Sequence, residues 1–132
     1  MCSSDLVRRP LLLDVDLSKR VLVVRGAHGV ERRISVGIGA PDTPTPVGSF
    51  YVTDKLRGAD FGSYYGCCIL ALSGRQPHLP KGWSGGDRLA IHGSPTPTWG
   101  QAVSNGCLHA SEADLRYLMR TVPLGTAVRI HA

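Results

Sequence analysis

Residues 11–38 read LLLDVDLSKRVLVVRGAHGVERRISVGI, and their short apolar runs separated by turns indicate the class of fold. Two short apolar runs, Leu11–Asp16 and Arg20–Arg25, are separated by a polar turn. Successive side chains of a strand point to opposite faces, and apolar residues in both positions are typical of a sheet covered on both sides. A turn follows at Gly26–Gly29, and Arg32–Ile38 continues the alternation. This stretch therefore predicts a β-meander.

Working outward, the same kind of short apolar run recurs along the chain. We predict further strands at Val47–Thr53, Cys67–Leu72, Arg88–His92 and Thr126–His131. Glycine and proline, 16 and 9 residues respectively, gather between these runs and mark turns. The fold class expected is mainly β, with mixed sheets in a sandwich-like arrangement. At 132 residues the chain has the size of one domain, residues 1–132, whose first ten residues are expected to be a flexible or artificial N-terminus.

One helix is clear, and it follows Cys107. Ser111 occupies an N-cap position with Asp114 three residues on, which is the spacing of a capping box. An apolar stripe follows, and Pro123 marks the end of the helix. The positive end of a helix dipole favours a thiolate, so the sequence predicts a lowered pKa for Cys107.

Composition limits the classes of function. The net charge is +5, but the basic residues are scattered, and only 6% of residues are aromatic, which argues against a nucleic-acid partner. No apolar run approaches the roughly 18 residues that span a bilayer, and no signal peptide is visible. No C-x-x-C pair indicates a metal site, and no cofactor is expected. Cys67 and Cys68 would point to opposite faces of a strand, one in the core and the other free, although a disulfide from either to another cysteine stays open.

Two short motifs carry the chemistry. His92-Gly93 ends a predicted strand, and Ser104-Asn105-Gly106-Cys107 begins twelve residues after His92. A thiol needs a neighbouring base to act as a nucleophile near neutral pH. We predict Cys107 as the nucleophile and His92 as its general base, oriented by the backbone carbonyl of Gly93. The backbone N–H groups of Gly106 and Cys107 would converge on an oxyanion and form an oxyanion hole.

These motifs resemble the YkuD-type L,D-transpeptidase family, whose pattern is H-G, about fifteen residues, then S-x-G-C. The segment Thr45-Pro46-Val47-Gly48-Ser49-Phe50 is similar to the family's T-P-x-G-x-F, and residues 122–128 resemble its closing strand. The resemblance implies an acyltransferase that needs no metal or cofactor. Its donor would be a peptidoglycan tetrapeptide stem that releases D-alanine, and an acceptor amine would complete a cross-link in the bacterial cell wall.

The resemblance also implies partners and a location. Peptidoglycan stem peptides would be the substrates, carbapenem-type β-lactams the covalent inhibitors, and the location extracytoplasmic. Substrate contacts are expected from Ser104, Asn105, His109, Trp83 and Tyr64.

Two positions depart from the family pattern. Asn105 stands where many members have histidine, and His109 where members often have arginine and sometimes asparagine. Because histidine gains its charge only at mildly acidic pH, substrate affinity would be pH-sensitive if His109 binds a carboxylate. Alternatives left open are an L,D-carboxypeptidase that uses water as acceptor and a non-catalytic cell-wall binding module on the same fold. Sortase-like and papain-like arrangements fit less well, because the spacing or the order of Cys and His differs.

Overall fold

The computed structural model describes residues 11–83 and 86–132, and the expectation for residues 1–10 lies outside this range. One α-helix is present in the described part, α2 (Glu112–Thr121), with two short 3₁₀ turns, η1 (Gly58–Asp60) and η2 (Ser63–Tyr65). The strands are β1 (Leu12–Asp16), β2 (Val21–Gly26), β3 (Gly29–Ser35), β4 (Ile38–Gly39), β5 (Gly48–Arg57), β6 (Cys68–Arg75), β7 (Arg88–His92), β8 (Ala102–Ser104), β9 (Leu108–His109) and β10 (Ala127–His131).

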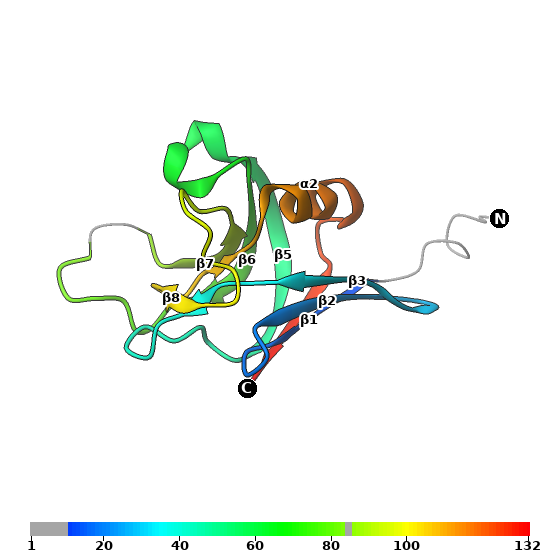
Figure 1. The fold of residues 1–132 in the computed structure, drawn as a ribbon, viewed down its shortest axis with the longest axis horizontal. Coiled ribbons are helices and arrows are strands. Elements are labelled where there is room, and N and C mark those ends of the chain that lie inside the picture. The colour runs from blue at the N-terminus through cyan, green and yellow to red at the C-terminus, as the bar shows by residue number, and fades with distance from the viewer. Residues whose placement is uncertain (1–10, 84–85) are drawn as a thin grey trace.

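The strands form a mixed sheet in the order β3-β2-β1-β10-β5-β6-β7-β9, and β4 pairs with β8 separately. The last strand, β10, lies between β1 and β5, so the first and last strands of the chain pair in the middle of the sheet (Figure 1). Most neighbours are antiparallel, while β1–β10 and β7–β9 are parallel. The mainly β fold with mixed sheets and one helix is confirmed, and the meander β1-β2-β3 stands at one end of the large sheet.

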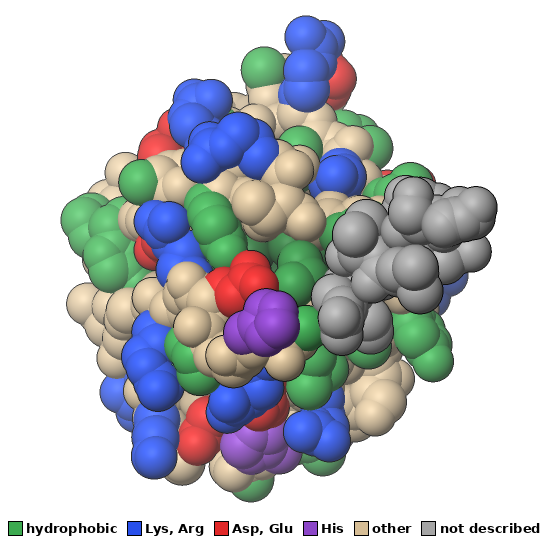
Figure 2. Space-filling view, turned by 90° about the vertical axis from the view of Figure 1, so that its right-hand side faces the viewer, with side chains coloured by type: hydrophobic (Ala, Val, Ile, Leu, Met, Phe, Trp, Pro, Cys, Tyr) green, Lys and Arg blue, Asp and Glu red, His purple; other side chains and the backbone are tan. Residues whose placement is uncertain are grey.

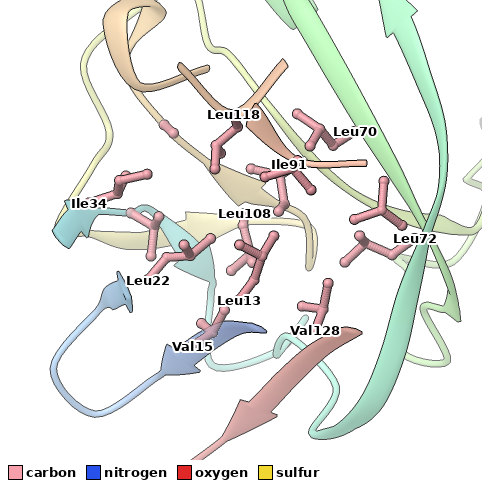
Figure 3. Packing of buried hydrophobic residues seen from close by; sticks show 14 of the residues in the cluster. Leu13, Val15, Leu22, Ile34, Leu70, Leu72, Ile91, Leu108, Leu118 and Val128 are labelled. Atoms are coloured by element: carbon pink, nitrogen blue, oxygen red, sulfur yellow. The ribbon is translucent and has the colours of Figure 1, made fainter. Parts of the chain in front are cut away.

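The core lies where the curled sheet closes on itself beneath α2. Leu13 from β1, Leu70 from β6 and Leu118 from α2 are all fully buried in one cluster (Figure 3). Ile91 and Leu108, the register partners of β7 and β9, lie at its centre, so the strands that carry the candidate motifs are anchored by full burial of apolar side chains.

The helix forms as its sequence predicts. The Ser111 hydroxyl accepts a hydrogen bond from Asp114 N–H at 3.2 Å, satisfying one of the free donors of the first turn. Leu115 and Leu118 face the core, and the helix ends at Thr121, ahead of Pro123.

Two short strands were not predicted, β8 and β9, which have three and two residues. Such short segments show no measurable alternation, and their strand geometry depends on partners elsewhere, β4 for β8 and β7 for β9. β6 also continues to Arg75, three residues beyond the Leu72 at which the predicted strand ends.

Basic side chains are spread over the surface. Figure 2 shows one face, on which lysine and arginine are interspersed with hydrophobic and acidic side chains. Several arginines are paired with carboxylates, as in Arg32–Asp114 and Arg75–Asp87. This distribution agrees with the scatter read in the sequence.

Candidate active site

Strands β7 and β9 bring the two motifs together. They run parallel with Ile91 opposite Leu108 and His92 opposite His109, and Cys107 immediately precedes β9. The chain between them, residues 93–107, returns to the same end of the sheet, so His92 and Cys107 come to line one pocket.

This pocket has a volume of about 410 Å³. Of the residues expected from the sequence, it is lined by Cys107, His92, Asn105, His109, Trp83 and Tyr64. Gly93, Ser104 and Gly106 do not line it but lie directly behind the residues that do. The remaining walls are mostly apolar, with Leu56, Ile69 and Ala90 among them, which is typical of small-molecule and peptide sites.

The His92 ring is held by the next residue's backbone. Its Nδ1 lies 2.6 Å from the Gly93 carbonyl oxygen, and only 3% of the residue is exposed. Because a carbonyl can only accept, Nδ1 carries the proton in this contact and Nε2 keeps its lone pair. Burial lowers the pKa of His92, although the bond to Gly93 opposes the shift. A neutral imidazole with a free Nε2 is the form that can take a proton.

Glycine follows His92 for a steric reason. A side chain at Gly93 would place a Cβ 2.9 Å from Tyr65 O and from the Cα of Gly66. The Gly93 N–H donates to the same Tyr65 carbonyl at 2.7 Å. This close approach seats η2 over the site, with the Tyr65 and His92 ring centroids 4.9 Å apart.

The Cys107 sulfur sits among neutral hydrogen-bonding groups. Gln76 Nε2 donates to it at 3.4 Å, and the thiol lies 3.8 Å from the Arg88 carbonyl as a donor. No hydrogen bond between this sulfur and His92 is found in the part of the chain that the structure describes. Catalytic contacts of free enzymes often tighten only when substrate is bound.

The predicted effect of the helix on Cys107 is wrong. Desolvation by burial raises the pKa of the thiol to about 11, while hydrogen bonds from the Ala90 backbone and the Gln76 side chain lower it. Two β9 residues separate Cys107 from Ala110 and the N-cap Ser111, and Glu112 and Asp114 place negative charge in the first turn. Burial therefore raises the pKa of Cys107 where the helix was expected to lower it, which favours the neutral thiol at neutral pH.

The loop before Cys107 is braced from within. Ser104 Oγ donates to Cys107 O at 2.6 Å and accepts from Gly106 N–H at 3.0 Å. Thr45 Oγ1 donates to Gly106 O at 2.8 Å, and Thr43 Oγ1 donates to Ser104 O at 2.7 Å. Ser104 is thus buried and holds the loop in place, and its contact with the substrate stays a prediction. The Thr-Pro segment has a structural role that the sequence did not reveal.

This brace changes the expected oxyanion hole. The N–H of Gly106 is already engaged by Ser104, whereas the N–H of Cys107 has no hydrogen-bond partner in residues 11–83 and 86–132. The available donor at this loop is therefore Cys107 itself.

His109 lies deeper than the sequence suggested. It is 3% exposed, its ring centroid is 4.7 Å from that of His92, and Thr98 Oγ1 is 2.9 Å from its Nδ1. Burial, with the nearby His92 as a second cause, lowers the pKa of His109 to about 4. In the free protein the side chain is therefore mostly neutral at neutral and mildly acidic pH and does not supply the charge of an arginine. Its pH-sensitive binding of a carboxylate stays a prediction.

Cys67 and Cys68 are bonded to each other by a disulfide. The expectation that they lie on opposite faces, one buried and one free, is wrong because Cys67 lies in the turn before β6 and only Cys68 belongs to the strand. Strand alternation therefore does not apply to this pair.

Several pocket residues were missed by sequence reasoning. Gln76, Arg88 and Asp54 line the site, and Arg88 pairs with Asp54 at 2.8 Å across its rim. Arg88 lies four residues before His92 on the same strand, so the alternation of β7 places both on one face. No motif marked Gln76, which follows the end of β6.

In the described residues, no three His, Cys, Asp or Glu side chains cluster as a metal site. The helix of the described chain is too short and too polar to cross a membrane.

Known proteins resemble this chain along nearly its whole length. The model of the YkuD family, the L,D-transpeptidase catalytic domain, matches residues 10–130. YkuD of Bacillus subtilis (strain 168), whose name assigns it provisionally to the L,D-transpeptidases, is 30% identical over 125 residues, which are 92% of this chain and 66% of that protein. The chain thus spans slightly less than two thirds of this relative's length.

Solved structures share the fold. L,D-transpeptidase 3 from Mycobacterium tuberculosis, in complex with a faropenem-derived adduct, superposes with a TM-score of 0.70 at 19% identity over 94% of this chain and 61% of that one. The LD transpeptidase LdtMt1 in complex with imipenem gives 0.66 at 20% identity over 93% and 59%. Since the family model covers almost all of the chain, this protein belongs to the YkuD family of L,D-transpeptidase catalytic domains.

Proposed function

We propose that this chain catalyses cysteine-dependent acyl transfer from a peptidoglycan tetrapeptide stem to an acceptor amine, which forms a cross-link in the bacterial cell wall. The observation that carries the proposal is a partly exposed cysteine sharing a mostly apolar pocket with a neutral histidine whose Nδ1 is bound to Gly93 O. Such work is done outside the cytoplasm, so we propose an extracytoplasmic location.

The first half-reaction forms a thioester. With a pKa of about 11, only about one thiol in ten thousand is ionised at pH 7, so the proton has to leave as the sulfur attacks. His92 Nε2 takes this proton while sulfur bonds to the carbonyl carbon of the third stem residue. The Cys107 N–H donates to the resulting oxyanion, a contact typically worth about 3 kcal/mol. The C–N bond then breaks, and the protonated His92 gives its proton to the departing D-alanine amine.

The second half-reaction uses an amine. The acceptor nitrogen attacks the thioester carbon, its proton passes to His92, and the C–S bond breaks to restore the thiol once the proton returns to sulfur. Water in place of the amine would give a trimmed stem, which is the carboxypeptidase outcome. The chain's own groups suffice for the proton transfers, and the apolar walls limit the access of water.

The pocket also offers contacts for the substrate. Asn105 presents an amide beside the nucleophile, and Tyr64 and Trp83 stand at the opening, 48% and 44% exposed. We propose that these three contact the stem peptide. His109 contributes as a neutral side chain that packs against His92 and lies beside Tyr64.

Intact-mass analysis with β-lactams tests the nucleophile. We expect imipenem and faropenem each to add one covalent adduct to the parent chain and none to Cys107→Ala. A parent that acquires no adduct, or an adduct on the alanine variant, would contradict the assignment and favour a non-catalytic wall-binding module.

Incubation with a tetrapeptide muropeptide donor and an amine-bearing acceptor tests the reaction. The expected product is a dimer lacking one D-alanine, and a donor that only loses D-alanine would indicate a carboxypeptidase. His92→Ala should stop both, whereas the same change at exposed His28, in the β2–β3 hairpin, serves as the matched control and should leave turnover unchanged.

A further inference from the structure

Gln76 lies at the floor of the pocket and contacts the nucleophile. It follows β6, its backbone N–H donates to Asp87 O at 2.8 Å, and only 8% of the residue is exposed. The side-chain Nε2 is 2.9 Å from Arg88 O and 3.4 Å from Cys107 Sγ. Both interactions involve one amide group, so its orientation decides whether the Cys107 sulfur faces the amide nitrogen or the amide oxygen.

The orientation of this amide is determined by Arg88. A backbone carbonyl only accepts hydrogen bonds, so the amide atom that faces Arg88 O at 2.9 Å must be nitrogen. Turning the amide over would set two oxygens against each other. With one N–H committed to Arg88 O, the second N–H of the same nitrogen is available to Cys107 Sγ.

The other amide atom is Oε1, and the loop before Cys107 confines it. It is buried with no hydrogen-bond partner in the described residues. A Cβ on Gly106 would lie 2.3 Å from it, so the S-x-G-C glycine leaves the room that this amide occupies. A buried acceptor without a partner is unfavourable, and such groups are concentrated where a function requires them.

Ionisation of the thiol changes these contacts in opposite directions. The neutral thiol lies within reach of Arg88 O as a donor, at 3.8 Å, and that contact becomes repulsive when the proton leaves. The contact from Gln76 Nε2 becomes charge-assisted and therefore stronger. The Gln76 amide is thus arranged to favour the sulfur after its proton has gone to the base.

We propose that Gln76 is a positioning residue for the nucleophile, whose Nε2–H holds the Cys107 sulfur and stabilises it as a thiolate. The proposal rests on the proposed function in taking Cys107 as the nucleophile. Gln76 does not touch the substrate in this role and acts only through the sulfur.

Other groups face the same space and affect the thiol's ionisation. They come from four elements around the pocket: Asp54 of β5, Tyr64 and Tyr65 of η2, Arg88 and His92 of β7, and His109 of β9. Arg88 is neutralised by Asp54, and both histidines have a pKa lowered by burial. Donors that act directly on the sulfur are then the Gln76 side chain and the Ala90 backbone, and only the first can be changed by mutation.

The test is the pH profile of Cys107 alkylation by iodoacetamide in two variants. Gln76→Met keeps an unbranched side chain of similar length without the N–H, and Gln76→Glu keeps the shape but places a carboxylate at the sulfur. We expect Gln76→Met to raise the apparent pKa of Cys107 and slow alkylation at pH 8 about tenfold, the effect of one pKa unit, and Gln76→Glu to slow it further. Gln101→Glu, the same charge change on an exposed residue, should follow the parent profile.

Circular dichroism and thermal unfolding establish that each variant is folded, and Gln76→Met covers the case in which Gln76→Glu is not. Folded variants with the parent's alkylation profile would overturn the proposal. The β-lactam adduct separates this outcome from failure of the proposed function: a parent that is acylated while its Gln76 variants keep the parent profile refutes only the role of Gln76. If the Gln76 variants shift the alkylation profile but the parent chain is never acylated by a β-lactam, the result supports the role of Gln76 and contradicts the proposed acyl transfer.

Discussion

Buried polar side chains have charged partners at one end of the large sheet and neutral partners at the other. At the meander end, Asp14 on β1 is nearly buried but is paired with Arg25 at 3.0 Å and His131 at 3.1 Å. At the β6-β7-β9 end, Gln76, His92 and His109 are as deeply buried, yet they bond to neutral groups and leave Gln76 Oε1 without a partner.

The difference indicates that the polar groups of the meander end serve stability, whereas those of the β7–β9 end serve the reaction. The ion pair of Asp14 with Arg25 and its hydrogen bond with His131 compensate a buried carboxylate, as a structural role requires. The β7–β9 end instead keeps a thiol and two imidazoles neutral and close together, which costs stability but leaves a base and a nucleophile ready for reaction. Both ends share one apolar core, so their contributions can be separated by mutation.

The largest loss in the free energy of unfolding is expected from a substitution in the apolar core at the meander end. Leu13→Ala removes a fully buried side chain and should lower the free energy of unfolding by about 2–5 kcal/mol. Urea unfolding measures this loss, and exposed Leu124→Ala, a change of the same kind, should stay within about 0.5 kcal/mol. The folded fraction of Leu13→Ala should still be acylated by imipenem; loss of acylation would show that the two ends are not separable.

The next effect is the pH dependence of the free energy of unfolding that comes from His109. Because the pKa of His109 falls to about 4 in the folded state, the unfolded state binds its proton first as the pH drops below 6.5. Stability is therefore complete above pH 6.5 and is lost as the pH falls toward 4, by about 3 kcal/mol for this residue. Urea midpoints at pH 7.5 and 4.5 measure the loss.

His109→Gln should flatten this dependence, since glutamine keeps a polar group near Thr98 without titrating. The matched control is His28→Gln at the exposed hairpin of the meander, which should keep the parent slope. A His109→Gln protein as sensitive to acid as the parent would place the acid-labile group elsewhere.

One glycine at each end of the large sheet allows the two ends to be compared by backbone substitution. Gly29 and Gly106 both have positive φ, +111° and +122°, but a Cβ at Gly29 meets open space while one at Gly106 meets Gln76 Oε1. Gly29→Ala should cost about 1 kcal/mol from backbone strain alone. Gly106→Ala should lower the free energy of unfolding by about 1 kcal/mol more than Gly29→Ala and should also slow alkylation of Cys107, because Gln76 must move. Equal losses of unfolding free energy in the two variants would contradict the contact between residue 106 and Gln76.

The smallest effect concerns the paired charges of the meander end. Arg25→Met should lower the free energy of unfolding by about 1 kcal/mol or less, because Arg25 is 45% exposed and exposed ion pairs contribute little. The loss should shrink in 1 M salt and leave alkylation of Cys107 unchanged. A loss above 2 kcal/mol would mean that His131, the remaining partner of Asp14, does not compensate the carboxylate without Arg25.

Local signals account for what could be predicted. Alternation in β1, β2 and β10 and the capped start of α2 are set by near neighbours in the chain, and all were found. His92 and Cys107 were recognisable for a similar reason, since each belongs to a short motif whose glycine is needed locally. The prediction that they meet depended on the parallel pairing of β7 with β9.

The contacts that surround the reacting groups could not be predicted. Thr45 bonds to a loop 61 residues away, and Gln76 reaches a sulfur 31 residues away. The pKa values of Cys107 and His109 follow from burial, which no spacing reveals, and for Cys107 burial overturned the expectation drawn from the nearby helix.

The sequence by itself determined the mainly β class, the capped helix and the identity of the candidate nucleophile and base, because propensity, alternation and short motifs are local properties. Tertiary packing was needed to show that Cys67 and Cys68 are bonded to each other where β6 begins, that Ser104 braces a loop and that Gln76 faces the Cys107 sulfur. These depend on where distant segments pack, and packing sets the solvation and hydrogen bonds on which the reactivity of the thiol depends.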